Sequence, residues 1–137
     1  MLSVTRTREI EWGDCDPAGI VFNPRYFAFF DHATTQLYAE AGWPKPVLLK
    51  TFGIVGCPLV ETGAKFLAPC AWGDEVTITS TVTEVGRSSF GVRHQLFKGE
   101  LLCVDAAEKR VWTVRRPDSG LIQSAPIPQE VVDRFTR

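Results

Sequence analysis

The sequence predicts an α+β fold in which one long helix packs across an antiparallel sheet. Residues 24–41 carry apolar side chains at helical spacing, whereas residues 75–97 alternate between apolar and polar side chains, as strands do. In chain order the predicted elements are one strand, the long helix, and then several strands separated by short turns. Consecutive strands joined by short turns pair in antiparallel fashion, so this order favours a helix against a sheet.

Residues 4–12, VTRTREIEW, predict the first strand, with Val4, Ile10 and Trp12 on one face. A loop with the sequence GDCDPAGIV follows over residues 13–21.

The long helix is predicted over residues 24–41. Asn23 is a favoured N-cap and Pro24 suits the first helical position, while Gly42 and Pro44 end the helix. Eighteen residues give a rod of roughly 27 Å. Apolar residues surround much of it, so we expect it to be covered on more than one side: Tyr26, Phe27, Phe29, Phe30, Leu37, Tyr38 and Ala41.

About five strands are predicted in total. A connector over residues 45–51, helical in one interpretation, leads to strands at 59–67, 75–85, 89–97 and 101–114. In the run 75–85, Val76, Ile78 and Val82 share one face and the threonines share the other. The tail, PIPQEVVDRFTR, predicts a short terminal helix.

Length and charge limit the possible functions. A chain of 137 residues is predicted to form one domain, residues 1–137. Its formal net charge of −1 gives no field that attracts nucleic acid or an anionic membrane. No apolar signal segment or membrane span is present, so a cytoplasmic protein is expected.

The cysteines and histidines do not predict a metal site. The four cysteines, at positions 15, 57, 70 and 103, form no Cys-x-x-Cys pair, and His32 and His94 complete no zinc-ligand spacing. We expect Cys57, Cys70 and Cys103 to be buried thiols.

The loop at residues 13–21 is the candidate for chemistry. Asp14 and Asp16 flank Cys15 and disfavour a thiolate there, and neighbouring side chains of an extended segment point apart, which disfavours a metal site. Pro17 and Gly19 can turn the chain so that the helix start approaches Asp16.

The helix start adds a second feature. Pro24 disfavours the helical conformation at Asn23, which leaves the Asn23 N–H free at the positive end of the helix dipole. A free N–H beside a carboxylate is the layout of an oxyanion hole with a nucleophile or base. The alternative is that Asp16 only caps the DPAG turn, and the residues alone favour that alternative.

Residues 11–31, EWGDCDPAGIVFNPRYFAFFD, closely resemble the signature of the 4-hydroxybenzoyl-CoA thioesterase family. The similarity continues through FGIVGCPLV (52–60), KFLAPCAWGDEVTI (65–78) and GRSSFGVRH (86–94). The resemblance implies a hotdog fold, in which a curved antiparallel sheet wraps around one long helix.

The resemblance also implies roles for individual residues. Asp16 matches the aspartate that attacks the thioester carbonyl or activates water, and the N–H of Asn23 matches the group that polarises the carbonyl oxygen. Asp31 matches a carboxylate that accepts a hydrogen bond from a ring hydroxyl, and Phe22 matches a residue beside the acyl pocket. Asp31, next to His32, could instead be a solvated or paired surface group. Family members acting on aliphatic acyl groups also carry acidic residues near this position.

The GRSS turn matches the loop that meets the nucleotide phosphates of coenzyme A, and it retains Arg87 and Ser89. Gly86 and Ser88 stand where the aromatic-acyl type has further basic residues. Arg93, Arg115 or a neighbouring subunit could supply the missing charge.

The function expected from these observations is hydrolysis of a (hydroxy)benzoyl-CoA or a related aromatic acyl-CoA, with no metal or redox cofactor and coenzyme A only as part of the substrate. Alternatives are a thioesterase for short aliphatic acyl-CoA, and a hotdog module that binds acyl-CoA or assembles without catalysis. A hydratase is disfavoured because neither histidine lies in a recognised motif. A homo-oligomer, dimer or tetramer, is expected because one sheet cannot cover the helix and leaves an open edge strand.

Overall fold

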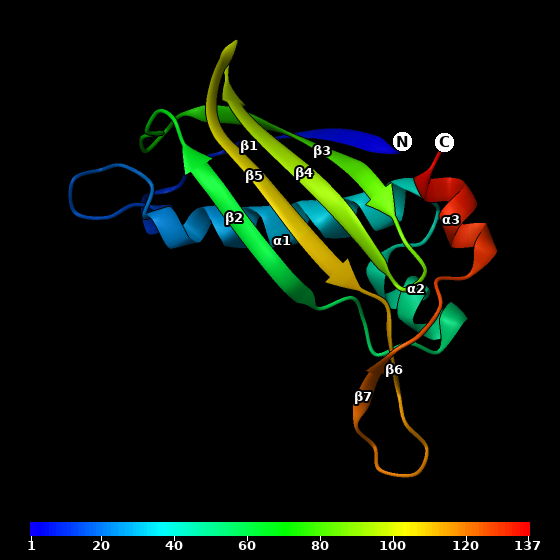
Figure 1. Cartoon of the computed structure of the whole chain (residues 1–137). Coiled ribbons are helices and arrows are strands. Elements are labelled where there is room, and N and C mark those ends of the chain that lie inside the picture. Colours follow the sequence, from blue (N-terminus) through cyan, green and yellow to red (C-terminus); the bar gives the residue numbers. More distant parts are fainter.

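Five strands form one antiparallel sheet that curves around a long helix in the computed structural model, which describes all 137 residues (Figure 1). The strand order is β1-β3-β4-β5-β2. The bounds are β1 Ser3–Glu9, β2 Leu59–Phe66, β3 Glu75–Val85, β4 Ser89–Lys98 and β5 Leu101–Val111, with α1 at Asn23–Glu40. The predicted hotdog fold is confirmed.

The remaining elements lie at one end of the sheet. They are α2 (Lys45–Phe52), α3 (Gln129–Phe135) and the pair β6 (Thr113–Arg115) and β7 (Ile122–Ser124), which forms a small separate sheet. This hairpin projects away from the rest of the chain at the bottom of Figure 1. The helical interpretation of residues 45–51 and the helix predicted in the tail are both confirmed. No helix is long and apolar enough to cross a membrane.

Helix α1 begins one residue earlier than predicted. Phe22, not Asn23, is the N-cap, and its carbonyl accepts the Arg25 N–H at 2.7 Å. The predicted end is confirmed by Gly42, whose φ of 108° lies in the region that favours glycine. The following N–H, of Trp43, donates to the Tyr38 carbonyl at 2.9 Å and closes the end of the helix.

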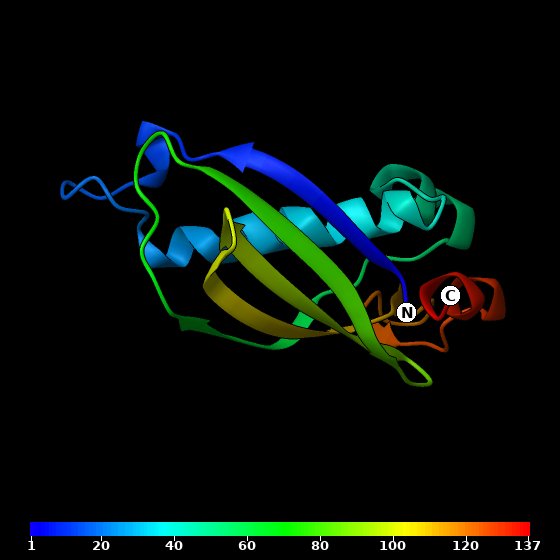
Figure 2. The same cartoon turned by 90° about the horizontal axis from the view of Figure 1, so that it is seen from above.

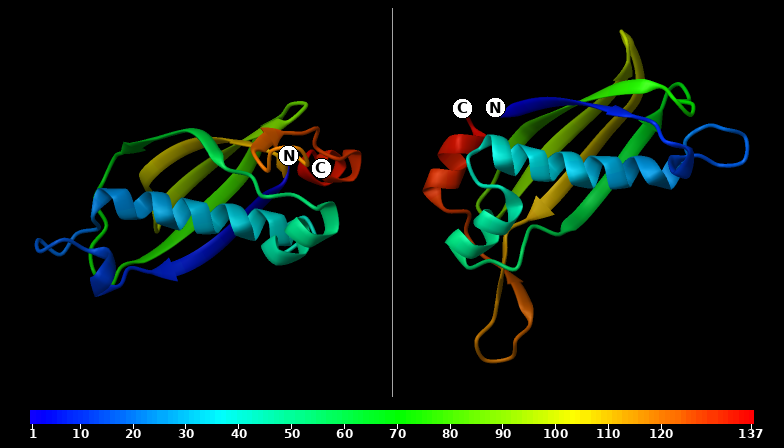
Figure 3. Two further views of the ribbon diagram at one scale, coloured as in Figure 1. Left: turned by 90° about the horizontal axis from the view of Figure 1, so that it is seen from below. Right: turned by 180° about the vertical axis from the view of Figure 1, so that it is seen from behind.

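The helix lies against the concave face of the sheet (Figures 2 and 3). On β3 the predicted alternation is confirmed, because Val76, Ile78 and Val82 are buried while the threonines face the other side. The core consists of two apolar clusters along α1, one around Phe29 and Phe30 and the other around Leu37 and Tyr38.

The first strand is shorter than predicted. β1 ends at Glu9, and a 3-10 helix follows at Trp12–Asp14. The chain turns there because the Asp14 carboxylate accepts the Glu11 N–H at 2.9 Å. Trp12 is therefore 56% exposed, whereas Val4 and Ile10 are buried, so the prediction that the three share one face was wrong.

The last long strand is divided. β5 ends at Val111 and β6 starts at Thr113, although one run over residues 101–114 was predicted. The Trp112 N–H donates to the Ser88 carbonyl, so the chain leaves the β4 ladder to contact the β3–β4 turn instead.

Candidate active site

Residues 15–21 form a tight hairpin before α1, seen as the blue loop at the left of Figure 1. The Asp16 N–H donates to the Ile20 carbonyl and the Gly19 N–H donates to the Asp16 carbonyl, both at 2.9 Å. Gly19 has a φ of 81°, which a side chain would disfavour. The turn predicted from Pro17 and Gly19 is present.

Asp16 is half-buried, and its two carboxylate oxygens have different surroundings. Oδ1 accepts the Ala18 N–H at 2.8 Å, so Asp16 does cap the DPAG turn. Oδ2 accepts no hydrogen bond from the chain and remains available to a substrate or a water molecule. The turn-capping and the chemical interpretations are therefore compatible in this geometry.

Asp14 differs from Asp16 because its carboxylate is used within the chain. It is 8% exposed, accepts the Glu11 N–H, and lies 3.7 Å from both Arg8 Nη2 and Arg25 Nε. These contacts hold the 3-10 turn against the start of α1. Asp14 is a structural residue.

Cys15 is a poor nucleophile in this setting. Burial and then the negative charges of Asp14, Asp16 and Asp74 raise the pKa of its thiol. A thiol with a raised pKa holds little thiolate at neutral pH. The other three cysteines are buried, as predicted. No group of three or more potential metal ligands is present.

The backbone N–H of Asn23 is free. As the first residue of an 18-residue helix it has no intrahelical acceptor, and it donates to no other group of the chain. The N-terminus of a helix favours a negative charge placed beside it. The donor is free as predicted, but Asn23 is itself the first helical residue and does not lie outside the helix as expected.

Asn23 also borders a cavity of about 220 Å³ between the start of α1 and the end of β2. The other lining residues are mostly apolar: Ile20, Val21, Tyr26, Phe66, Leu67, Ala68 and Pro69. A mostly apolar cavity with one polar residue in its lining is typical of sites that bind a molecule with a polar group on an apolar body.

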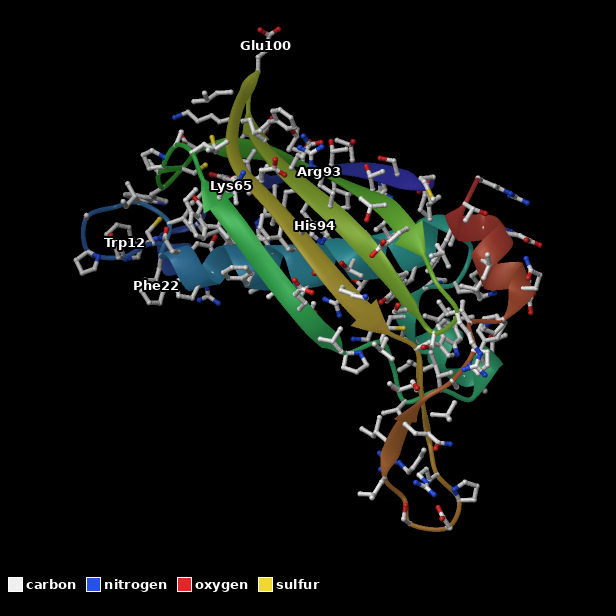
Figure 4. All side chains as sticks on the ribbon, viewed as in Figure 1. Trp12, Phe22, Lys65, Arg93, His94 and Glu100 are labelled. Carbon is white, nitrogen blue, oxygen red and sulfur yellow. The ribbon has the colours of Figure 1, made fainter.

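The hairpin and the helix start are joined, but one chain does not enclose Asp16 in this cavity. The Phe22 N–H donates to the Asp14 carbonyl at 3.0 Å, which brings the base of the hairpin to the start of α1. Asp16 itself is not among the residues that line the cavity. Phe22 is 58% exposed and lies at the same end of the molecule as Trp12 (Figure 4).

Asp31 lies apart from Asn23. The two are eight residues apart in α1, which is about 12 Å along the axis. Asp31 is exposed, and its Oδ1 accepts a hydrogen bond from Arg110 Nη2 at 2.8 Å. The structure therefore gives Asp31 a specific partner that the sequence analysis did not identify.

Arg110 belongs to a buried polar network between α1 and the sheet. Arg110 Nε donates to Glu108 at 2.8 Å, and Glu108 in turn contacts the Thr34 hydroxyl and His94 Nε2, the latter at 3.3 Å. The other ring nitrogen of His94 lies 2.7 Å from Ser80 Oγ. Burial alone would raise the pKa of Glu108, but hydrogen bonds from His94, Arg110 and Thr34 lower it to about 2.

The sequence contained one signal for this network. On β5 the inward-facing residues are Val104, Ala106, Glu108 and Arg110, in one alternating register. Two charged residues on the inward face of a strand need buried partners. The run was predicted only as a strand, with no face assigned, so neither charged residue was predicted to be buried.

His94 is enclosed by the core and cannot reach a substrate. It is fully buried, and its ring stacks on Phe30 with centroids 5.0 Å apart. Figure 4 shows it in the middle of the sheet, in front of α1. Although His94 is paired with an acid, the hydratase alternative gains no support from it.

Arg87 lies in the β3–β4 turn and Ser89 begins β4, at the far end of the sheet from Asp16. The eleven residues of β3 separate its two ends by roughly 33 Å. The Arg87 side chain is exposed and makes no ion pair. Arg93, considered as a substitute, binds Asp105 through two hydrogen bonds of 3.0 and 2.8 Å. One chain therefore does not bring the predicted coenzyme A residues close to Asp16.

Comparisons with known proteins agree with this fold. Residues 10–135 match the sequence model of the thioesterase-like superfamily. The chain belongs to the thioesterase-like superfamily. It is 32% identical to 4-hydroxybenzoyl-CoA thioesterase of Pseudomonas sp. strain CBS-3, over 96% of each chain. The solved structure of that enzyme superimposes with a TM-score of 0.87 at 31% identity, covering 98% of this chain and 99% of the other.

Other members of the superfamily are also similar. The structure of a gentisyl-coenzyme A thioesterase matches with a TM-score of 0.83 and 31% identity, over 98% of this chain and all of the other. A 1,4-dihydroxy-2-naphthoyl-CoA hydrolase of Crocosphaera subtropica is 30% identical over 69% of this chain and 68% of its own length. The resemblance drawn from the sequence is confirmed, and the chain is an enzyme of the thioesterase class.

Proposed function

We propose that this thioesterase hydrolyses an aromatic acyl-CoA, a (hydroxy)benzoyl-CoA or a related compound, to the free acid and coenzyme A. The names of the similar thioesterases support the class of substrate, since they act on hydroxybenzoyl, gentisyl and dihydroxynaphthoyl thioesters of coenzyme A. In this proposal Asp16 is the nucleophile or general base, and the Asn23 N–H binds the carbonyl oxygen.

The observation that carries the proposal is that Asn23, whose backbone N–H is free, lines a mostly apolar cavity. An oxygen bound to this N–H gains negative charge as the carbonyl is attacked, and the N-terminus of α1 stabilises that charge. The apolar wall suits an aromatic acyl group. Asp16 Oδ2, which the turn leaves free, supplies the attacking or proton-accepting oxygen.

Two chemical routes use the same groups. In the first, Asp16 attacks the carbonyl carbon, coenzyme A leaves as the thiolate, and water then hydrolyses the resulting anhydride to restore Asp16. In the second, Asp16 accepts a proton from water as that water attacks, and the proton passes to the leaving thiolate. Both routes consume one water and yield one acid and one thiol.

We also propose that the complete site forms between subunits. Asp16 lies outside the cavity that Asn23 borders, and the Arg87 turn lies at the other end of the sheet. β2 is an edge strand with exposed apolar residues, including Val60 at 58% and Phe66 at 44% exposure. Pairing through such an edge gives a homo-oligomer, and it would bring Asp31, Phe22, Arg87 and Ser89 of neighbouring chains to one acyl-CoA.

The test is free-thiol release from a panel of substrates: benzoyl-, 2-, 3- and 4-hydroxybenzoyl-, phenylacetyl- and short aliphatic acyl-CoAs. We expect hydroxylated aromatic substrates to have the highest kcat/KM. Preference for an aliphatic acyl group would reject the proposed substrate class. Binding of acyl-CoA without thiol release from any substrate would instead support a non-catalytic module.

A further inference from the structure

Arg110 connects the sheet to α1 through hydrogen bonds at every nitrogen of its guanidinium group. It is 6% exposed. Nε and Nη2 donate to the two carboxylate oxygens of Glu108, at 2.8 and 3.3 Å, and Nη1 donates to the Cys57 carbonyl at 3.0 Å. Nη2 also donates to Asp31 Oδ1 at 2.8 Å. The guanidinium plane is fixed by these contacts.

Glu108, the main partner of Arg110, is itself held on its far side. His94 and Thr34 contact Glu108 Oε1, and Ser80 contacts His94. These groups come from α1, β3 and β4, so the orientation of Arg110 depends on both layers of the fold. A guanidinium held in this way can fix the position of a carboxylate that it binds at the surface.

Asp31 is the group that Arg110 holds at the surface. Its side chain is 57% exposed, and Oδ1 is occupied by Arg110 while Oδ2 accepts no hydrogen bond from the chain. Oδ2 is therefore held in a fixed position and can accept a hydrogen bond from a ligand. Its charge is balanced in part by Arg110, so it suits a neutral donor such as a phenolic hydroxyl.

We propose that Arg110 is a positioning residue that fixes Asp31 so that Oδ2 accepts one hydrogen bond from the hydroxyl of the acyl ring. Arg110 thereby sets the preference for hydroxylated over unsubstituted aromatic acyl groups. The inference rests on the proposed function. It requires arginine and not lysine, because a lysine ammonium cannot bind both oxygens of Glu108 and Asp31 in one plane.

The first test is the ratio of kcat/KM for the preferred hydroxybenzoyl-CoA to that for benzoyl-CoA. In Arg110→Lys we expect this ratio to fall by roughly 10-fold or more, through a higher KM for the hydroxylated substrate. The matched control is Arg93→Lys, which alters an arginine–aspartate pair on the outward face of the sheet and should keep the ratio. Equal losses for both substrates in Arg110→Lys would show a merely structural role and overturn the inference.

A second test leaves Arg110 intact, since its replacement could impair folding by leaving Glu108 buried without its partner. In Asp31→Asn, Arg110 holds the amide oxygen, so the amide NH₂ faces the ring. We expect this variant to prefer the methoxybenzoyl-CoA analogue, which only accepts hydrogen bonds, over the hydroxybenzoyl-CoA. Retained preference for the hydroxyl would mean that the amide is free to rotate, and would overturn the inference.

The two proposals can fail separately. A wild-type enzyme that releases no thiol from any aromatic acyl-CoA contradicts the proposed function. A wild-type enzyme that hydrolyses these substrates with a high hydroxyl preference, together with unchanged ratios in both variants, contradicts only the role of Arg110.

Discussion

The ring of His94 stacks on the ring of Phe30, with centroids 5.0 Å apart and planes only 9° from parallel. Phe30 belongs to one of the two apolar clusters of the core. His94 belongs to a layer of buried polar residues between these clusters, which also contains Glu108 and Arg110. Glu108 is ionised within that layer because Arg110, His94 and Thr34 donate hydrogen bonds to it. A buried charge held only by its partners makes stability depend on pH.

The free energy of unfolding should fall in acid because of Glu108. Its folded-state pKa is about 2, below the ordinary value of 4.5, so its contribution is present above pH 4.5 and is lost as the pH falls toward 2. The contribution amounts to about 3 kcal/mol. Denaturant unfolding between pH 6 and 2, at constant protein concentration, measures it.

The control for this prediction is Glu108→Gln. The variant should be less stable at neutral pH and should lose less stability between pH 5 and 2 than the wild type. If both proteins lose the same stability over this range, Glu108 is not the group responsible.

Asn23 acts through its backbone in this account, so proline and alanine should have different effects. Asn23→Pro removes the N–H but suits the first turn of a helix, and we expect kcat to fall by about 10²–10³-fold. Asn23→Ala keeps the N–H and removes only a side chain that makes no hydrogen bond, so its loss should be far smaller. Steady-state thiol release measures both. Similar losses in the two variants would assign the role to the side chain.

The thiol of Cys15 should react slowly with alkylating reagents. Because burial and three nearby carboxylates raise the pKa of its thiol, iodoacetamide at pH 7.5 should alkylate it more slowly than free cysteine. Mass spectrometry of the alkylated protein gives the rate at this position. Cys15→Ser should still release thiol from the substrate. A folded but inactive Cys15→Ser protein would instead indicate that Cys15 is the nucleophile.

The sequence predicted the fold well where the signals are local. The alternation of β3, the Gly42 stop and the turn at Pro17–Gly19 each depend on a few neighbouring residues, and all three are confirmed. The strand predicted over residues 4–12 is present but ends at Glu9, because the Asp14 side chain turns the chain at Glu11, which alternation does not reveal.

The candidate site was only partly predictable for a different reason. The Arg110–Asp31 contact joins residues 79 positions apart, and it depends on how β5 is placed relative to α1. The far position of Arg87 likewise follows from the length and direction of β3. Such contacts come from tertiary structure, whereas the free Asn23 N–H follows from one helix start.

In the proposed function Asp16, and not its neighbour Asp14, carries the chemistry. The most direct measurement is thiol release from the best aromatic acyl-CoA by Asp16→Asn and Asp14→Asn, together with the thermal midpoint and acyl-CoA affinity of each. We predict that Asp16→Asn keeps its midpoint and affinity while kcat falls by about 10²–10⁴-fold. In Asp14→Asn, where the contacts to Glu11, Arg8 and Arg25 are weakened, the main effect should be a lower midpoint. Full turnover in Asp16→Asn would contradict the account.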